Sequence, residues 1–142
     1  MANYHFDKLF NPGEADELIP VIAPLIQKLQ EIARELRAKI EVIAVEDPAV
    51  ERMQLPQIIE RHSDLRELAG RMATAAQEIE SYGCFLKDID LGLIDFPWEI
   101  EEGNVVFLCW QPGEDQIVAW HPVEGGFAQR QPIPGANKPY LH

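Results

Sequence analysis

The chain has 142 residues, of which 46% are apolar and 25% charged, a composition typical of one folded domain and not of a disordered chain. The 24 Asp and Glu residues outnumber 12 Lys and Arg, and the net charge of −12 disfavours nucleic acid and anionic membranes as partners. No signal peptide opens the sequence, and its longest apolar run, IPVIAPLI, is too short to span a bilayer. We therefore expect a cytoplasmic protein in which Cys84 and Cys109 are buried apolar fillers rather than a disulfide.

The first predicted element is a long amphipathic helix that begins after Asn11. Asn11 and Glu14 have the spacing of a capping box, and Pro12 suits the first helical position. Apolar residues then recur in steps of three and four, at Leu18, Ile22, Leu25, Leu29, Ile32, Leu36, Ile40 and Ile43. Pro20 and Pro24 each remove a helical hydrogen bond, at about 3 kcal/mol, so the helix either splits at Pro20 or kinks. A kinked but continuous helix is the favoured prediction.

A second helix is predicted over residues 57–81, after a connector that contains Asp47-Pro48 and Pro56. Its stripe consists of Ile58, His62, Leu65, Ala69, Met72, Ala76 and Ile79. His62 is expected to lie at the helix seam with one nitrogen hydrogen-bonded. The two helices predict an antiparallel hairpin of coiled-coil type over about residues 12–82. Because two helices cannot bury their stripes on all sides, the hairpin is expected to form a homodimer.

Strand-like patterns replace the helical period after Gly83, over residues 84–88, 92–96, 104–111 and 116–121. The turn sequence QPGEDQ predicts a hairpin in which Gln111 pairs with Gln116. This register places Cys109 opposite Val118 and His121 opposite Val106, so Cys109 and His121 lie on opposite faces. Both faces are apolar, so one should cover the helices and the other should be covered by the tail, a partner or a ligand.

The remaining segment is rich in Gly and Pro and predicts an extended strap that docks Phe127 and Ile133. The fold class is therefore α+β: a long antiparallel helical hairpin, a small and mainly antiparallel β-sheet, and an extended C-terminal strap. One domain over residues 1–142 is expected, with the helical hairpin at about 12–82, the β cap at about 84–133 and the tail at 134–142. The cap should lie at the end opposite the helix connector.

Several sequence blocks resemble one known family. They are EADELIP in the first helix, LKDIDLGLIDFP from Leu86 to Pro97, CWxxGE from Cys109 to Glu114, WH at Trp120, and GFxxRxP from Gly126 to Pro132. Together they make the chain similar to the bacterial DUF2203 family of uncharacterised proteins, from Phe10 to Pro132. The resemblance implies that the function is unassigned.

Candidate catalytic residues gather in the β cap: His121, Glu114, Asp95 and Arg130. His121 is suited to a general base or a metal ligand, or is a half-buried residue hydrogen-bonded to backbone or an acid. Glu114 offers a carboxylate from the hairpin turn. Arg130 either clamps an anion or pairs with Asp95 or Glu114 to fasten the strap, and the structural pairing is favoured. Trp110 is expected to be a core residue.

Metal-ligand candidates are Asp88, Asp90, Asp95 and His121, which supply oxygen ligands and one imidazole for a divalent cation. No recognised metal spacing, nucleophile motif or phosphate loop occurs in the sequence. A Cys109–His121 nucleophile pair is disfavoured by the predicted register. The favoured function is thus a homo-oligomeric protein that binds a protein partner or a small ligand without catalysis. The alternative is a metal-assisted or acid–base enzyme with its site in the β cap.

Overall fold

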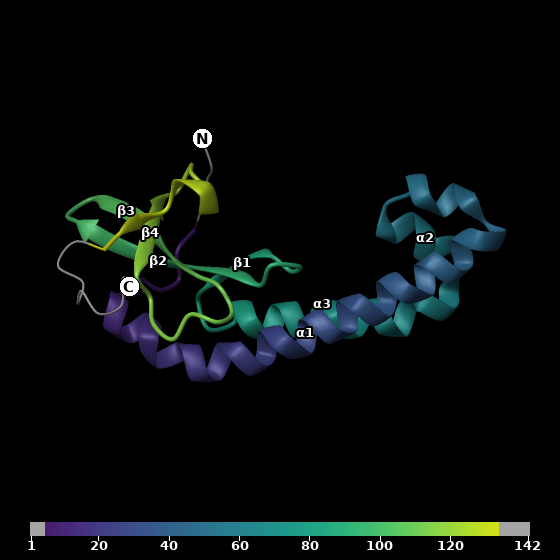
Figure 1. Cartoon of the computed structure of the whole chain (residues 1–142), viewed down its shortest axis with the longest axis horizontal. Helices are drawn as coiled ribbons and strands as arrows, with labels where there is room; N and C mark the ends of the chain where they lie inside the picture. The colour runs from purple at the N-terminus through teal and green to yellow at the C-terminus, as the bar shows by residue number, and fades with distance from the viewer. Residues whose placement is uncertain (1–4, 134–142) are drawn as a thin grey trace.

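Helix α1 is the longest element of the molecule and runs unbroken from Pro12 to Glu46 in the computed structural model, which describes residues 5–133. The predicted capping box is present: Glu14 donates its backbone N–H to Oδ1 of Asn11 over 2.8 Å, and the Asn11 N–H donates to Oε1 of Glu14 over 2.9 Å. Pro20 and Pro24 lie on the exposed side. The helix is therefore continuous, as predicted, and its first turns curve away from the line of the rest (Figure 1).

The predicted second helix is wrong in one respect, because the segment is broken at His62. It consists of α2 (Leu55–Arg61), a 3-10 turn (Ser63–Leu65) and α3 (Arg66–Glu80), and a further 3-10 turn (Pro48–Arg52) precedes it. Asp47, at the end of α1, accepts hydrogen bonds from Arg61 (2.7 Å) and His62 (2.8 Å). These contacts fold α2 back over the end of α1. The hydrogen bond from Arg61 has the largest effect in lowering the pKa of the Asp47 carboxyl, and the hydrogen bond from His62 has the next largest.

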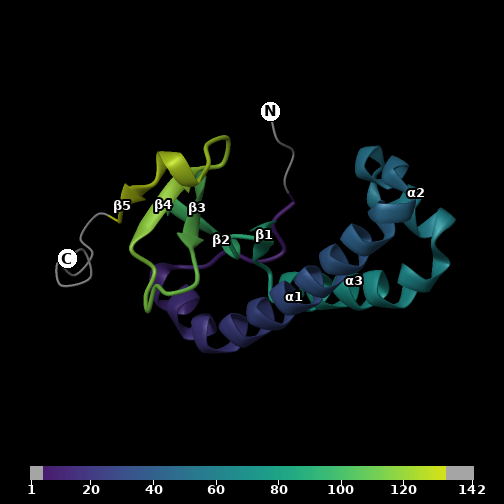
Figure 2. The same cartoon turned by 45° about the vertical axis from the view of Figure 1, so that its right-hand side comes forward.

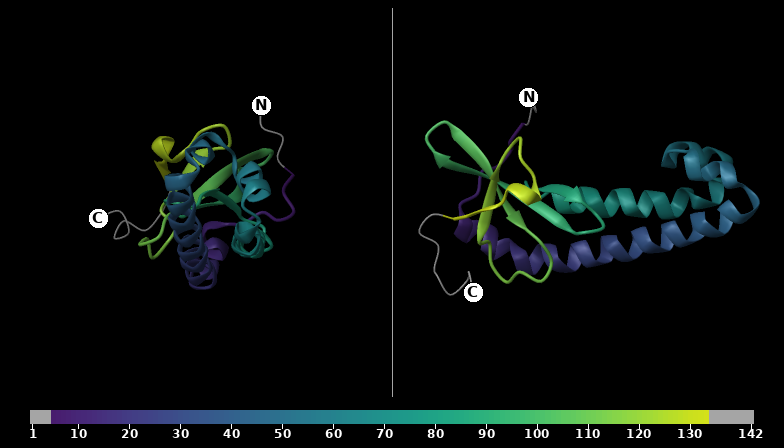
Figure 3. Two further views of the ribbon diagram at one scale, coloured as in Figure 1. Left: turned by 90° about the vertical axis from the view of Figure 1, so that its right-hand side faces the viewer. Right: turned by 45° about the horizontal axis from the view of Figure 1, so that its top comes forward.

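Helices α1 and α3 run antiparallel and side by side, with α2 at one end of the pair and the sheet at the other (Figure 3). Their seam follows much of the predicted stripes, but in the first half of α1 Ile19 and Ile26 are buried, whereas the predicted Leu18 and Leu25 are only partly buried. The residues that contribute most are Ile22, Ile26, Leu29, Ile32, Leu36, Leu65, Leu68 and Ile79. None of the helices within residues 5–133 combines the length and apolar character needed to cross a membrane.

The sheet has five strands, all antiparallel, in the order β1-β2-β3-β4-β5 (Figure 2). The strands are β1 (Phe85–Asp88), β2 (Leu93–Glu101), β3 (Asn104–Trp110), β4 (Ala119–Pro122) and β5 (Gln131–Pro132). The predicted strap contains a 3-10 turn (Phe127–Gln129) and β5, after which Ile133 is buried, as predicted, whereas Phe127 is exposed. The α+β fold is thereby confirmed, while the predicted tail, 134–142, lies outside the described residues.

The predicted pairing of β3 with β4 is wrong by one residue. Cys109 pairs with Ala119 instead of Val118, and His121 pairs with Phe107 instead of Val106. The connecting loop is longer than predicted, because the Ile117 N–H donates to Oδ1 of Asp16 on α1, over 2.7 Å, instead of joining the sheet. A shift of one residue moves every side chain of a strand to the other face. Cys109 and His121 therefore share a face of the sheet.

The two faces of the sheet have different coverings. The inner face, which includes Phe96 and Trp110, packs on the helices and on Phe10, and Trp110 is a core residue as predicted. The outer face is covered by Phe6, whose ring lies 6.0 Å from that of Phe107, and by the loop that follows β4. The covering of this outer face thus comes from the two ends of the described chain.

Candidate functional site

Three adjacent strands bring Asp95, Cys109 and His121 together on the outer face of the sheet. Asp95 on β2 lies directly opposite Cys109 on β3, and His121 on β4 lies two pairs further along, opposite Phe107. All three side chains are buried: 2% of Asp95, 1% of Cys109 and 3% of His121 is exposed. One potential ligand atom from each residue lies within 4.8 Å of the other two. We refer to these three residues as the Asp–Cys–His cluster.

Both nitrogens of His121 are hydrogen-bonded. Nε2 lies 2.9 Å from Oδ2 of Asp95, and Nδ1 lies 2.8 Å from the carbonyl oxygen of Pro122. A carbonyl oxygen only accepts, so Nδ1 carries a proton and donates it. Lys87, on β1, places its Nζ 3.7 Å from the same Asp95 oxygen. Asp95 is therefore held between two basic groups, Lys87 on β1 and His121 on β4.

The environment of His121 favours its protonated form. Burial lowers the pKa of His121, but the hydrogen bond and negative charge of Asp95, together with the Pro122 carbonyl, outweigh burial and the charge of Lys87. The net result is a pKa above the ordinary value of 6.5. At a pH below this raised pKa, and without another cation present, His121 faces Asp95 as an imidazolium.

Cys109 is a poor nucleophile in this setting. Burial raises the pKa of its thiol to about 12, and the negative charge of Asp95 acts in the same direction, whereas Arg130 opposes it. The reactive form of cysteine is the thiolate, which is scarce at neutral pH when the pKa is so high. Although the corrected register places Cys109 and His121 on one face, the cluster does not have the electrostatics of a cysteine–histidine nucleophile.

A small cavity of about 90 Å³ adjoins the cluster. Its walls are the three cluster residues, Lys87 and Leu93, and the loop residues Gly125, Gly126 and Phe127. Such a space has room for water or a ligand of a few atoms. The sulfur, imidazole and carboxylate around it are also the donor types found at zinc sites.

The structure divides the four candidate catalytic residues into two groups. Asp95 and His121 form the buried pair, whereas Arg130 donates from Nη2 to Oε2 of Glu114 over 2.7 Å. The other Glu114 oxygen, Oε1, accepts the Gln111 N–H over 2.8 Å. Arg130 thus ties the strap to the β3–β4 loop, as the favoured structural reading predicts, and neither Glu114 nor Arg130 lines the small cavity.

The predicted acidic metal ligands are also dispersed. Asp90 forms an ion pair with Arg37 of α1 over 2.7 Å, and Oδ1 of Asp88 accepts the Leu91 N–H within the β1–β2 turn. Asp95 and His121 remain adjacent, and the third donor beside them is Cys109. The predicted register places Cys109 on the opposite face from His121, because the face of Cys109 depends on the length of the β3–β4 loop. His62 has one nitrogen hydrogen-bonded, as predicted, but it lies at the break that ends α2 and not on a helix seam.

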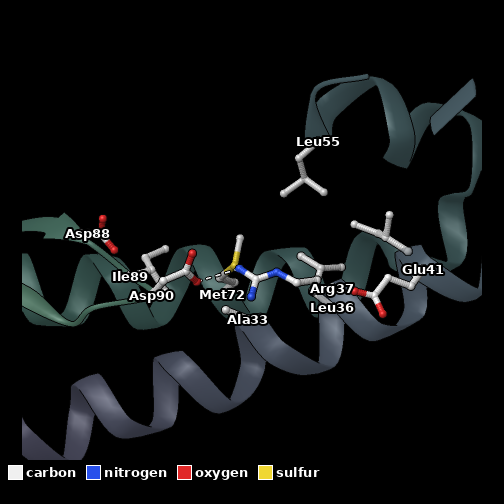
Figure 4. A pocket seen from close by; sticks show the side chains of 10 residues that line it. Ala33, Leu36, Arg37, Glu41, Leu55, Met72, Asp88, Ile89 and Asp90 are labelled. Atoms are coloured by element: carbon white, nitrogen blue, oxygen red, sulfur yellow. Dashed lines mark hydrogen bonds and ion pairs between the residues drawn. The ribbon is translucent and has the colours of Figure 1, made fainter. Parts of the chain in front are cut away.

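A second concave feature is an open groove of about 520 Å³ over the helical hairpin. It lies between the β1–β2 turn and α2, and Figure 4 shows the Arg37–Asp90 ion pair within it. Its apolar lining comes from α1, α2, α3 and the turn, namely Ala33, Leu36, Ile40, Leu55, Met72 and Ile89. We refer to this feature as the hairpin groove.

The fold and the site define an α+β protein that joins a helical hairpin to a β cap with a buried Asp–Cys–His cluster. The chain belongs to the family of uncharacterised conserved proteins called DUF2203, whose model matches residues 8–133. The match covers the helical hairpin, the sheet and all three cluster residues. Neither a curated protein nor a solved structure gives a significant match.

The raised pKa of His121 leads to a prediction about pH. Folding favours protonation of this imidazole, so its contribution to stability is present below pH 6.5 and is lost as pH rises through the pKa of the folded protein. With a metal chelator present, the urea concentration at the midpoint of unfolding of the wild-type protein is therefore expected to fall as the pH rises from 6.5 through the pKa of His121 in the folded protein. His121→Asn should flatten this part of the profile, and an equally steep fall in the variant would contradict the assignment.

Proposed function

We propose that the protein is a non-catalytic binding protein that acts as a homodimer paired through its helical hairpin. The observation that carries the proposal is an apolar surface on α1 that faces solvent. Val42 is 73% and Val45 is 81% exposed, although both lie on a long, well-formed helix. With Ala38 they follow steps of four and three, which makes a second apolar stripe on a different side of α1 from the residues that line the hairpin groove.

A second copy of the chain suits this surface better than a strongly charged partner does. Arg37 lies in the hairpin groove together with Glu41 and Asp90, so the surface carries both signs of charge. A twofold axis pairs a patch with its own copy, and mixed charges allow such a patch to be complementary to itself. The exposed stripe is the apolar area that the second copy would cover, and the groove offers further apolar side chains on another side of α1.

The chemistry of the β cap supports binding more than catalysis. The His121 nitrogens and the Glu114 and Arg130 side chains are engaged in hydrogen bonds, and the Cys109 thiol has a pKa of about 12. The alternative of an acid–base enzyme requires these side chains to meet in one cleft, which the cavity lining does not support. Two buried free thiols also fit the reducing cytoplasm, where we place the protein.

Sedimentation of the purified protein at micromolar concentration tests the homodimer. We expect twice the mass of the chain, and expect Val42→Lys with Val45→Lys to weaken the dimer at least about tenfold. A buried valine contributes about 1.5 kcal/mol, and about 1.4 kcal/mol corresponds to a factor of ten. Lysine also reduces the net charge of −12, so general repulsion between copies would not explain the loss.

The matched control is Val21→Lys, which makes the same change on the same helix at another exposed valine. It should leave the dimer intact, and the circular dichroism of all variants should match that of the wild-type protein. A monomeric wild-type protein at these concentrations would overturn the proposal. A monomer that binds a small apolar fluorescent probe in the groove would instead support a ligand-binding protein.

A further inference from the structure

The contact between His121 and Asp95 requires a cation between two acceptor atoms. Because Nδ1 donates its proton to the Pro122 carbonyl, a neutral His121 presents the lone pair of Nε2 to Asp95. Two electron-rich atoms 2.9 Å apart repel each other unless a proton or a metal ion lies between them. The proton gives the imidazolium–carboxylate pair described above. A metal ion can take the place of the proton, and the position of a third donor, Cys109, beside the pair favours a metal ion.

The third donor points to a metal. Cys109 lies directly across the strand pair from Asp95, and the three ligand atoms lie within 4.8 Å of one another. Zinc binds sulfur at about 2.3 Å and nitrogen or oxygen at about 2.0–2.2 Å, so its ligands lie roughly 3–4 Å apart. The upper limit of 4.8 Å between the three atoms lies within about 1–2 Å of this spacing. Beside a proton shared by His121 and Asp95, the Cys109 thiol is only a hydrogen-bond partner of Asp95, whereas a metal ion uses its sulfur as a ligand.

The surroundings also suit a bound dication. Zinc-ligating histidines commonly donate their second ring N–H to a backbone carbonyl, as Nδ1 of His121 does to Pro122. A thiolate and a carboxylate together neutralise a charge of +2, so the occupied site has no net charge beside Lys87. The cavity of about 90 Å³ supplies space for a fourth ligand, such as water.

We propose that Asp95, Cys109 and His121 form a binding site for one transition-metal dication, with zinc as the preferred ion. Thiolate and imidazole select such ions over magnesium and calcium, which require mainly oxygen ligands. Each ligand comes from a different strand, so the ion links β2, β3 and β4 across the outer face of the sheet. This site goes beyond the proposed homodimer and does not depend on it.

Cobalt titration of the full chain, stripped of metal with a chelator, tests the site. Cobalt(II) reports thiolate ligation through a charge-transfer band in the near ultraviolet, and its visible bands report tetrahedral geometry. We expect one equivalent of cobalt to produce both signals, and zinc to displace it. Elemental analysis should give one zinc per chain, and zinc should raise the temperature of unfolding.

The chain supplies a matched control, because it contains two cysteines and both are buried. Burial raises the pKa of each thiol to about 12, but Cys84 donates to the Ile79 carbonyl instead of facing the cluster. Cys109→Ser is expected to abolish the thiolate band and weaken cobalt binding at least about 100-fold, since even outer-shell changes cost about 10–100-fold. Cys84→Ser should retain the band.

The proposal is overturned if the wild-type protein binds no cobalt, or binds it without a thiolate band. It is also overturned if Cys84→Ser removes the band. If Cys109→Ser fails to fold, as judged by circular dichroism, the wild-type spectrum and Cys84→Ser still decide between these results. Sedimentation of the metal-free protein tests the homodimer separately, so the failure of one proposal is distinguishable from the failure of the other.

Discussion

Replacement of Asp95 with alanine is expected to lower the free energy of unfolding by about 3–5 kcal/mol, the usual consequence of removing one partner of a buried ion pair. Asp95 is 2% exposed, lies 2.9 Å from Nε2 of His121 and is 3.7 Å from Nζ of Lys87. In the variant, a buried imidazole faces a methyl group. Urea unfolding in a chelator, at a pH below 6.5 where His121 is charged, measures the loss.

A double variant separates the loss of a partner from the loss of the pair. Asp95→Leu with His121→Leu replaces both polar side chains by apolar ones, which is often neutral or stabilising at a buried ion pair. We therefore expect the double variant to be more stable than Asp95→Ala. Strict additivity of the two single leucine variants, or a loss below about 1 kcal/mol in Asp95→Ala, would contradict a coupled buried pair.

Gly92→Ala is expected to destabilise the protein by about 2–5 kcal/mol. Gly92 ends the β1–β2 turn with a φ of +71°, a left-handed conformation that costs other residues about 1–2 kcal/mol. A Cβ at this position would lie 2.6 Å from Cγ of Pro112 and 3.1 Å from Nε2 of Gln30. Such overpacking adds about 1–3 kcal/mol. Urea unfolding measures the sum.

Gly103→Ala is the matched control for this prediction. Gly103 also has a positive φ, of +78°, but no atom lies within 4 Å of an added Cβ. Only the conformational cost of about 1–2 kcal/mol applies. If both variants lose the same stability, the close approach of Pro112 to the turn is not important. A larger loss in Gly92→Ala shows that the turn is held tightly against the β3–β4 loop.

The same turn illustrates which contacts were invisible in the sequence. Gln30, a partly buried residue of α1, donates from Nε2 to the carbonyl oxygens of Ile89 and Asp90 at 3.1 Å each. No local pattern marks a glutamine as the residue that docks a turn some 60 positions later. Likewise, the local pattern does not mark the break at His62, because the predicted apolar stripe continues through it without a change of period. The break is accompanied by a hydrogen bond between His62 and the distant Asp47.

The candidate site in the β cap is predictable from local sequence only in part. The residue types of Asp95 and His121 mark them as candidates, and the structure places them in contact. The turn sequence alone predicts the wrong face for Cys109, because it gives a pairing of β3 with β4 that is wrong by one residue. The Ile117–Asp16 hydrogen bond draws part of the loop onto α1 and lengthens it. One contact with a distant helix thus changed the composition of the site.

Periodicity and capping residues are properties of neighbours in the chain, so the α1 boundary, the α1–α3 hairpin and the change to strands after Gly83 follow from the amino-acid sequence. The partners of buried polar groups do not follow from it, because strand alternation converts a one-residue change of loop length into a change of face. Contacts with α1 set that length. The Asp–Cys–His cluster is therefore a product of tertiary packing.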